Sequence, residues 1–265
     1  RAMAMIGGSI ATTFAVSLVL APKLAEWIGL PGIFLLTAAL TLIALLAVRF
    51  HIPDPAIMRF HSDAETSRAR LPAVLRDPQL LRLNYGVFAL HSAQMAMFTV
   101  LPLLFSQVGR LDLQDHWQVY LPVVLGSFVL MVPAIIYGEK RHQLKRVFVA
   151  AIALMLLAQL GMALWLPDLG SIVLWLALYF VAFNILEATQ PSLISKIAPA
   201  DAKGTAMGVY NTCQSLSLFA GSAAGGVIYQ HWGATPVFVL CAALVAFWLW
   251  LAAGMQAPRA VKTQL

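Results

Sequence analysis

The chain has 265 residues, of which 61% are hydrophobic and only 11% are charged, whereas soluble domains have roughly 45–50% apolar and about 25% charged residues. A water-soluble fold cannot hide so much apolar surface, so we expect lipid to surround the protein. The net charge of +6 would suggest an anionic partner for a soluble protein. Here the distribution of charge along the chain is more informative, and we expect no nucleic-acid partner.

Long apolar stretches follow one another along the chain. A membrane helix needs roughly 20 mostly apolar residues to cross about 30 Å of hydrocarbon. The apolar runs are continuous rather than alternating, which favours helices over strands. They cover residues 2–21, 32–49, 83–106, 118–138, 147–166, 171–194, 204–229 and 236–255. The sequence therefore predicts an all-α, polytopic membrane protein with eight transmembrane helices.

The connections between these stretches alternate in charge. One side of the membrane would hold 15 of the 17 basic residues, and the other only Lys23 and Arg110. Because loops rich in Lys and Arg stay in the cytoplasm, we predict that both ends of the chain are cytoplasmic. The 15 residues are Arg1, Arg49, Arg59, Arg68, Arg70, Arg76, Arg82, Lys140, Arg141, Lys145, Arg146, Lys196, Lys203, Arg259 and Lys262.

One long polar connection, residues 51–82, divides the chain. We interpret it as a cytoplasmic linker that ends in a short amphipathic helix over 71–81. Two predicted spans precede it within 1–50, and six follow within 83–255. Residues 256–265 would form a cytoplasmic tail.

The sequence contains no GxGxxG pattern, Walker loop, HExxH or GxSxG, which are signatures of soluble enzymes and nucleotide sites. Cys213 and Cys241 lie inside apolar runs without a CxxC pattern, so we interpret them as packing residues. We expect no metal, no cofactor and no enzymatic reaction. Transport without an ATP site would have to use an ion gradient.

Several segments carry a family resemblance. They are LRDPQLLRLN at 75–84, VAFNILE at 181–187 with PSLISK at 191–196, and KGTAMGVY at 203–210. In collinear order they resemble the major facilitator superfamily, and within it the YajR-type bacterial inner-membrane transporters. Members of this superfamily have two six-helix halves built from inverted repeats.

The resemblance implies that the chain holds helices 5–12 of a partial major-facilitator fold, with helices 1–4 lying upstream. It implies a multi-pass protein of the bacterial inner membrane. The implied activity is secondary active transport by alternating access, with a small-molecule substrate and protons as partners. Efflux of small organic molecules by proton antiport is the leading hypothesis.

A pattern in the first span is similar to the antiporter motif of helix 5 in that superfamily. Small residues replace several of its glycines, and Glu26 replaces the last one. Such a pattern allows close helix contact and a proline bend, although ordinary helix packing would use the same residues. The matching residues are Gly8, Ser17, Ala21 and Pro22.

Glu187 is the only acidic residue within the predicted spans. A charge at mid-bilayer costs roughly 2.5–3.5 kcal/mol, so such residues usually have a role. Asn184 and Gln190 lie three residues before and after it, near the same helical face. The pattern fits a proton carrier and a structural hydrogen-bonding acid equally well.

A polar layer is predicted at the depth of Glu187. His91 lies nine residues after Arg82, and Glu187 nine before Lys196, which places both roughly 13 Å from the same boundary. Polar residues at one depth on several helices indicate the lining of a cavity for protons or substrate. The set is Glu187, His91, Asn184, Asn211 and Gln214, with Gln94 one turn deeper on the face of His91.

Two other classes of function stay open. An intramembrane enzyme would need a nucleophile–base or metal pair within the bilayer, for which His91 and Glu187 are the candidates. A non-transporting membrane scaffold would need no site, and the polar layer favours transport over it.

The pattern Gly221-x3-Gly225-Gly226, like Gly204-x3-Gly208, predicts close helix packing.

Overall fold

The computed structural model describes residues 2–51 and 68–255, with side chains in only part of 2–22. In these ranges every regular element is a helix. The predicted tail, 256–265, and most of the predicted linker lie outside the described residues. The chain forms two compact units, Arg1–Phe60 with Asp112–Pro122, and His61–Leu111 with Val123–Leu265.

The first unit contains α1, Ala2–His51, and the 3-10 turn η2, Leu113–Asp115. Gly29 interrupts α1 with φ 66° and ψ 175°. Glycine adopts positive φ without steric cost because it has no Cβ. Two helical segments therefore follow each other where two spans are predicted, and the connection between them is shorter than the expected 22–31.

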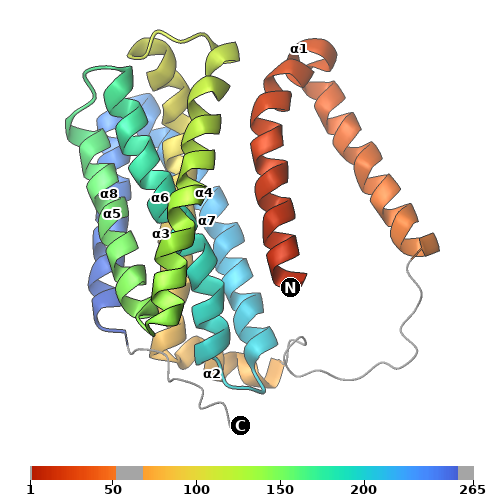
Figure 1. Ribbon diagram of the computed structural model, residues 1–265, viewed down its shortest axis with the longest axis vertical. Helices are drawn as coiled ribbons and strands as arrows, with labels where there is room; N and C mark the ends of the chain where they lie inside the picture. The colour runs from red at the N-terminus through yellow and green to blue at the C-terminus, as the bar shows by residue number, and fades with distance from the viewer. Residues whose placement is uncertain (1, 52–67, 256–265) are drawn as a thin grey trace. The chain divides into compact units, whose positions relative to one another are not determined.

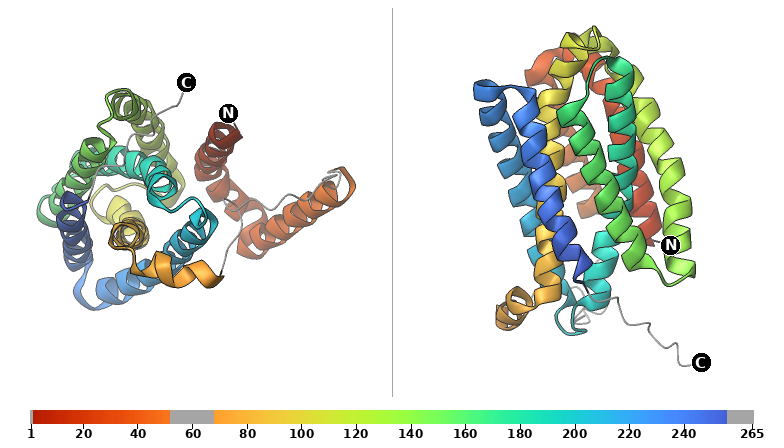
Figure 2. Two further views of the ribbon diagram at one scale, coloured as in Figure 1. Left: turned by 90° about the horizontal axis from the view of Figure 1, so that it is seen from below. Right: turned by 90° about the vertical axis from the view of Figure 1, so that its left-hand side faces the viewer.

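The second unit is a block of long helices (Figure 1). Seen along the helix axes, α3 lies inside the block with α6, α7 and α8 around it, and α5 packs between α6 and α8 (Figure 2). From Val123 onward α4 also belongs to this unit. The helices after α1 are α2 Leu71–Arg76, α3 Pro78–Gln107, α4 Trp117–Lys140, α5 Leu144–Leu164, α6 Leu169–Ile197, α7 Lys203–Trp232 and α8 Ala234–Ala253.

The short helix expected over 71–81 begins at Leu71 as predicted, but the prediction of its end is wrong. Helix α2 ends at Arg76, and Asp77 is extended before Pro78 begins α3. The Asp77 carboxylate accepts hydrogen bonds from the backbone N–H of Gln79, at 2.7 Å, and of Leu80, at 3.1 Å. Asp at the cap and Pro in the first turn start a new helix here, and this local signal outweighs the apolar spacing.

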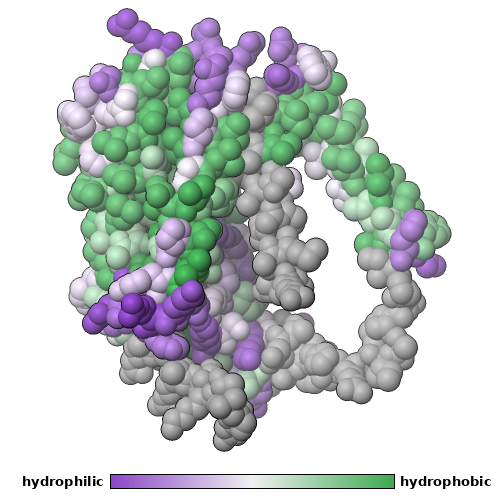
Figure 3. Space-filling view, viewed as in Figure 1, coloured by the Kyte–Doolittle hydropathy of each residue, from purple (hydrophilic) through white to green (hydrophobic). Residues whose placement is uncertain are grey.

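Six helices of the described part are long and apolar enough to cross a membrane. Apolar side chains cover the sides of α4 and α5, and hydrophilic ones gather at their ends (Figure 3). The all-α, polytopic class is thereby confirmed. Helix α7 has 30 residues, but its many Gly, Ser and Thr residues keep it outside this group, so a span there stays a prediction. The six segments are Lys23–His51, Pro78–Gln107, Leu113–Lys140, Leu144–Leu164, Leu169–Ile197 and Ala234–Ala253.

Glycines let α7 approach α3. A Cβ added to Gly221 would lie 2.6 Å from the Cα of Ser92, and one added to Gly225 would lie 2.7 Å from the Cα of Ala96. Both distances are too short for any side chain larger than hydrogen. Gly226 faces open space, so the close contact predicted from this pattern is confirmed for its first two glycines.

Candidate functional site between α3, α6 and α7

Three polar side chains from three helices meet in the second unit. They are His91 of α3, Glu187 of α6 and Gln214 of α7. The Nε2 atom of His91 lies 3.3 Å from Oε2 of Glu187 and 2.8 Å from Nε2 of Gln214. These three members of the predicted polar layer form the candidate site, named here the His–Glu–Gln cluster.

The backbone determines which nitrogen of His91 carries a proton. Its Nδ1 lies 3.1 Å from the carbonyl oxygen of Val87, one helical turn earlier. A carbonyl only accepts, so Nδ1 must donate. In a neutral ring Nε2 is then bare and accepts from the amide of Gln214. In a charged ring Nε2 carries a proton and can donate to the carboxylate of Glu187.

The Glu187 side chain is partly exposed, although the carboxyl oxygen that faces His91 is buried. Its Oε2 atom, which faces His91, is buried, while 39% of the side chain is exposed. The His91 side chain is only 5% exposed, and Phe183 packs edge-on against its ring with centroids 5.8 Å apart. The atoms that form the contact, Nε2 of His91 and Oε2 of Glu187, are therefore both shielded, while another part of the Glu187 side chain is exposed.

Asn184 does not join this cluster. Its amide nitrogen donates to Oγ of Ser127 on α4 at 2.7 Å, and that hydroxyl donates to the carbonyl of Val124 at 2.6 Å. Asn184 therefore ties α6 to α4. Gln190 is fully buried, and within the described residues its amide has no hydrogen-bond partner.

The other predicted residues lie apart from these contacts. Asn211 is exposed on α7, three residues before Gln214, and Gln94 is half-buried on α3. Neither has a hydrogen bond to the cluster among the described contacts. The antiporter-like residues belong to the first unit, and the side chains of Gly8 and Pro22 are outside the description. Ser17 and Ala21 are exposed within α1.

Two tyrosines near Glu187 were not predicted. Tyr179 and Tyr210 are within electrostatic range of its carboxyl group and are almost wholly buried. Within the described residues neither phenol has a hydrogen-bond partner. The sequence could have pointed to Tyr210, because Tyr210 precedes Gln214 by four residues and so lies on the same face of the helix. Both hydroxyls could hydrogen-bond a carboxylate or a water molecule.

We expect Ser127→Ala to destabilise the protein. The substitution leaves the buried amide of Asn184 without its acceptor, at a cost of about 1–3 kcal/mol. Thermal unfolding in detergent should show a lower melting temperature. Ser215→Ala is the matched control, because the Ser215 hydroxyl is exposed and bonds only its own helix, to Asn211 at 3.0 Å. Equal losses in both variants would contradict the role assigned to the pair.

Comparison with known proteins places this helical block in a family. The profile of the Major Facilitator Superfamily matches residues 1–222. The "Inner membrane transport protein YajR" of Escherichia coli (strain K12) is 36% identical over 258 residues, which cover 97% of this chain and 57% of that protein.

More distant relatives are also transporters by name. "Uncharacterized transporter BU466" of Buchnera aphidicola subsp. Acyrthosiphon pisum is 28% identical over 83% of this chain and 57% of its own length. "Multidrug resistance protein MdtH" of Aeromonas salmonicida is 25% identical over 62% of this chain and 41% of its own. The chain thus spans 57% of the length of the first two of these curated relatives and 41% of the third. The predicted resemblance is confirmed, and the chain belongs to the Major Facilitator Superfamily.

Proposed function

We propose that this chain is part of a secondary active transporter of the bacterial inner membrane that exports small organic molecules in exchange for protons. The His–Glu–Gln cluster carries the proposal. It joins three helices of one block through a histidine and a carboxyl group that are 3.3 Å apart. Two relatives are named an inner membrane transport protein and a multidrug resistance protein. These names support a location in the inner membrane and transport out of the cell.

Protonation would change the contacts of His91. When His91 is neutral, its Nε2 accepts a hydrogen bond from the amide of Gln214, and the ring next to Glu187 carries no positive charge. When His91 gains a proton, its Nε2 donates to Glu187, and Gln214 must turn its amide oxygen toward the ring or lose the bond. A proton would therefore move the hydrogen bond of Nε2 from Gln214 of α7 to Glu187 of α6, although both side chains already lie close to the ring. Such an exchange can bias two arrangements of the helices.

The exposed side of α7 supports a water-filled cavity near the cluster. Asn211, Thr212 and Ser215 are exposed in the middle of this helix. Polar side chains within a membrane face a bundle interior or water rather than lipid. We propose that this face of α7, together with Gln94 of α3, lines the substrate pathway.

The remaining organisation follows the same proposal. Residues 1–50 would supply the last two helices of the N-terminal half, with Gly8, Ser17, Ala21 and Pro22 in its antiporter-like motif. Residues 83–255 would form the C-terminal half, and both ends of the chain would be cytoplasmic. An enzymatic role has less support, because the described contacts of His91 are to Val87, Phe183, Glu187 and Gln214, none of which is a nucleophile of the hydroxyl or thiol type.

Efflux should require the proton gradient. Cells that produce the full-length protein are loaded with ethidium, and efflux is followed by fluorescence before and after addition of a protonophore. We expect efflux above the vector control to fall to that control when the gradient collapses, because the coupling proton no longer flows inward. Efflux that persists without a gradient while ATP is maintained would contradict proton antiport.

A further inference from the structure

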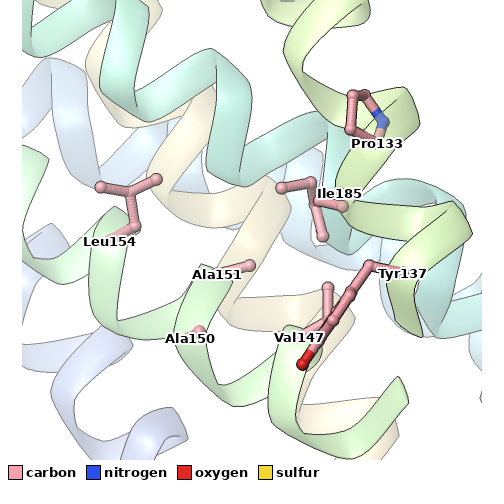
Figure 4. A pocket seen from close by; sticks show the side chains of 8 residues that line it. Pro133, Tyr137, Val147, Ala150, Ala151, Leu154 and Ile185 are labelled. Carbon is pink, nitrogen blue, oxygen red and sulfur yellow. The ribbon is translucent and has the colours of Figure 1, made fainter. Parts of the chain in front are cut away.

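An apolar groove lies between α4 and α5, and none of its lining residues belongs to the His–Glu–Gln cluster. It has a volume of about 430 Å³, which falls in the range of about 300–1,000 Å³ found for small-molecule sites. Residues of α5 line one side, Pro133 and Tyr137 of α4 line the other, and Ile185 of α6 lies between them (Figure 4). The lining is Pro133, Ala134, Tyr137, Val147, Ala150, Ala151, Leu154 and Ile185. A membrane-embedded groove of this composition suits a hydrocarbon chain.

The turn between α4 and α5 connects Tyr137 to Val147, which both line the groove, and it is strongly basic. Lys140, Arg141 and Arg146 are exposed there, and none of them has an ion-pair partner among the described residues. The one acidic residue of the turn, Glu139, pairs with Lys196 of α6 at 2.9 Å. The turn therefore presents positive charge that nothing in the described part of the chain neutralises.

Hydrogen bonds connect the groove to this positive charge. The Nη1 atom of Arg146 donates to Oε1 of Gln143 at 3.2 Å, and the hydroxyl of Tyr137 approaches the same oxygen at 3.5 Å. Tyr137 and Val147, which adjoins Arg146, both line the groove. The guanidinium group of Arg146 is thus held at the end of the apolar groove.

The start of α5 adds to the attraction for an anion. This helix of 21 residues begins at Leu144, and Gln143 in the capping position makes no side-chain hydrogen bond to its first turn. Free backbone N–H groups at a helix N-terminus carry partial positive charge and bind phosphate groups. They point toward the same turn as Arg141 and Arg146.

We propose that this groove binds an acyl chain of an anionic phospholipid whose phosphate lies against Arg141, Arg146 and the first turn of α5. The apolar lining selects a hydrocarbon chain, and the uncompensated basic residues select a net negative headgroup. A zwitterionic lipid would carry its own positive group into the same basic turn and would be disfavoured. Basic pockets between membrane helices bind anionic headgroups in this manner.

Native mass spectrometry of the purified full-length protein tests the proposal. The protein in detergent is titrated with phosphatidylglycerol and, separately, with phosphatidylcholine of the same chains. We expect preferential binding of phosphatidylglycerol, and we expect Arg141→Gln with Arg146→Gln to weaken that binding about fivefold for each charge removed. The control pair, Arg68→Gln with Arg76→Gln, removes two exposed charges from α2 and its preceding turn. This pair should leave the binding of phosphatidylglycerol unchanged.

A second pair of variants tests the groove itself. Ala150→Phe fills the groove and should weaken the binding of phosphatidylglycerol, whereas Ala153→Phe, on an exposed position of α5 outside the groove, should leave this binding unchanged. Equal binding of the two lipids would overturn the proposal, as would unchanged binding in the Arg141/Arg146 pair. Displacement of phosphatidylglycerol by glycerol phosphate alone would also overturn it, because the headgroup would then bind without the groove.

Discussion

Glu187→Gln is expected to abolish gradient-driven efflux while the protein still inserts and folds. A carboxyl group that carries a proton must change its charge during the cycle. Glutamine keeps the size and the hydrogen-bonding capacity of Glu187 but remains neutral throughout. In the ethidium assay the variant should match the vector control for efflux against the gradient. Passive equilibration of the dye should be retained, because binding does not require the proton. Melting temperature and yield should stay close to those of the parent protein.

Glu187→Ala should behave differently. It removes the partner of a buried His91 and leaves polar atoms unpaired, at a cost of about 1–3 kcal/mol, so lower yield is expected as well as lost transport. Asp112→Asn is the matched control, because Asp112 is an exposed acid outside the cluster and its loss should leave efflux unchanged. If Glu187→Gln were fully active and Glu187→Ala unstable, Glu187 would have a purely structural role. If both were active and stable, the site assignment would be wrong.

Gly221→Ala is expected to cause the largest loss of stability among single-residue changes in α7. The new Cβ would lie 2.6 Å from the Cα of Ser92 and closer still to its carbonyl oxygen. Backbone atoms cannot rotate away as a side chain can, so α7 must move away from α3. Overpacking of this kind costs about 1–3 kcal/mol, and the shift would also separate Gln214 from His91.

Gly226→Ala provides the control on the same helix. A Cβ there meets nothing within 4 Å, and alanine is the better helix former by about 1 kcal/mol. Thermal unfolding should therefore show a lower melting temperature for Gly221→Ala and an unchanged or higher one for Gly226→Ala. A loss of the same size in both variants would mean that helix propensity or lipid contact, rather than the α3–α7 seam, governs stability here.

The membrane fold was predictable because its physical cause acts within short segments. Each span must hide its own backbone polar groups in hydrocarbon, so composition and length alone mark it. The interruption at Gly29 falls between two predicted spans. The error over 71–81 arose where two local signals competed, and the Asp77–Pro78 pair ended one helix and began the next.

The site was predictable only in part. Counting from Arg82 and Lys196 placed His91 and Glu187 at one depth, because rise per residue is constant along a helix, and the structure brings these two side chains together. However, the depth of a residue along a helix does not determine the direction in which its side chain points around the helix axis. Asn184 precedes Glu187 by three residues, which turns it by about 60° around the axis, and that turn is enough to aim it at Ser127 of α4 instead.

The sequence by itself determined that lipid surrounds this protein. It also determined which segments form helices and at what depth along them the ionisable residues lie. These properties depend on the composition and spacing of single helices. Only the tertiary structure decided which helices meet at the cluster and that a groove adjoins the basic turn. Those properties depend on how helices far apart in the chain rotate and approach, as when Gly221 and Gly225 let α7 close on α3 and carry Gln214 to His91.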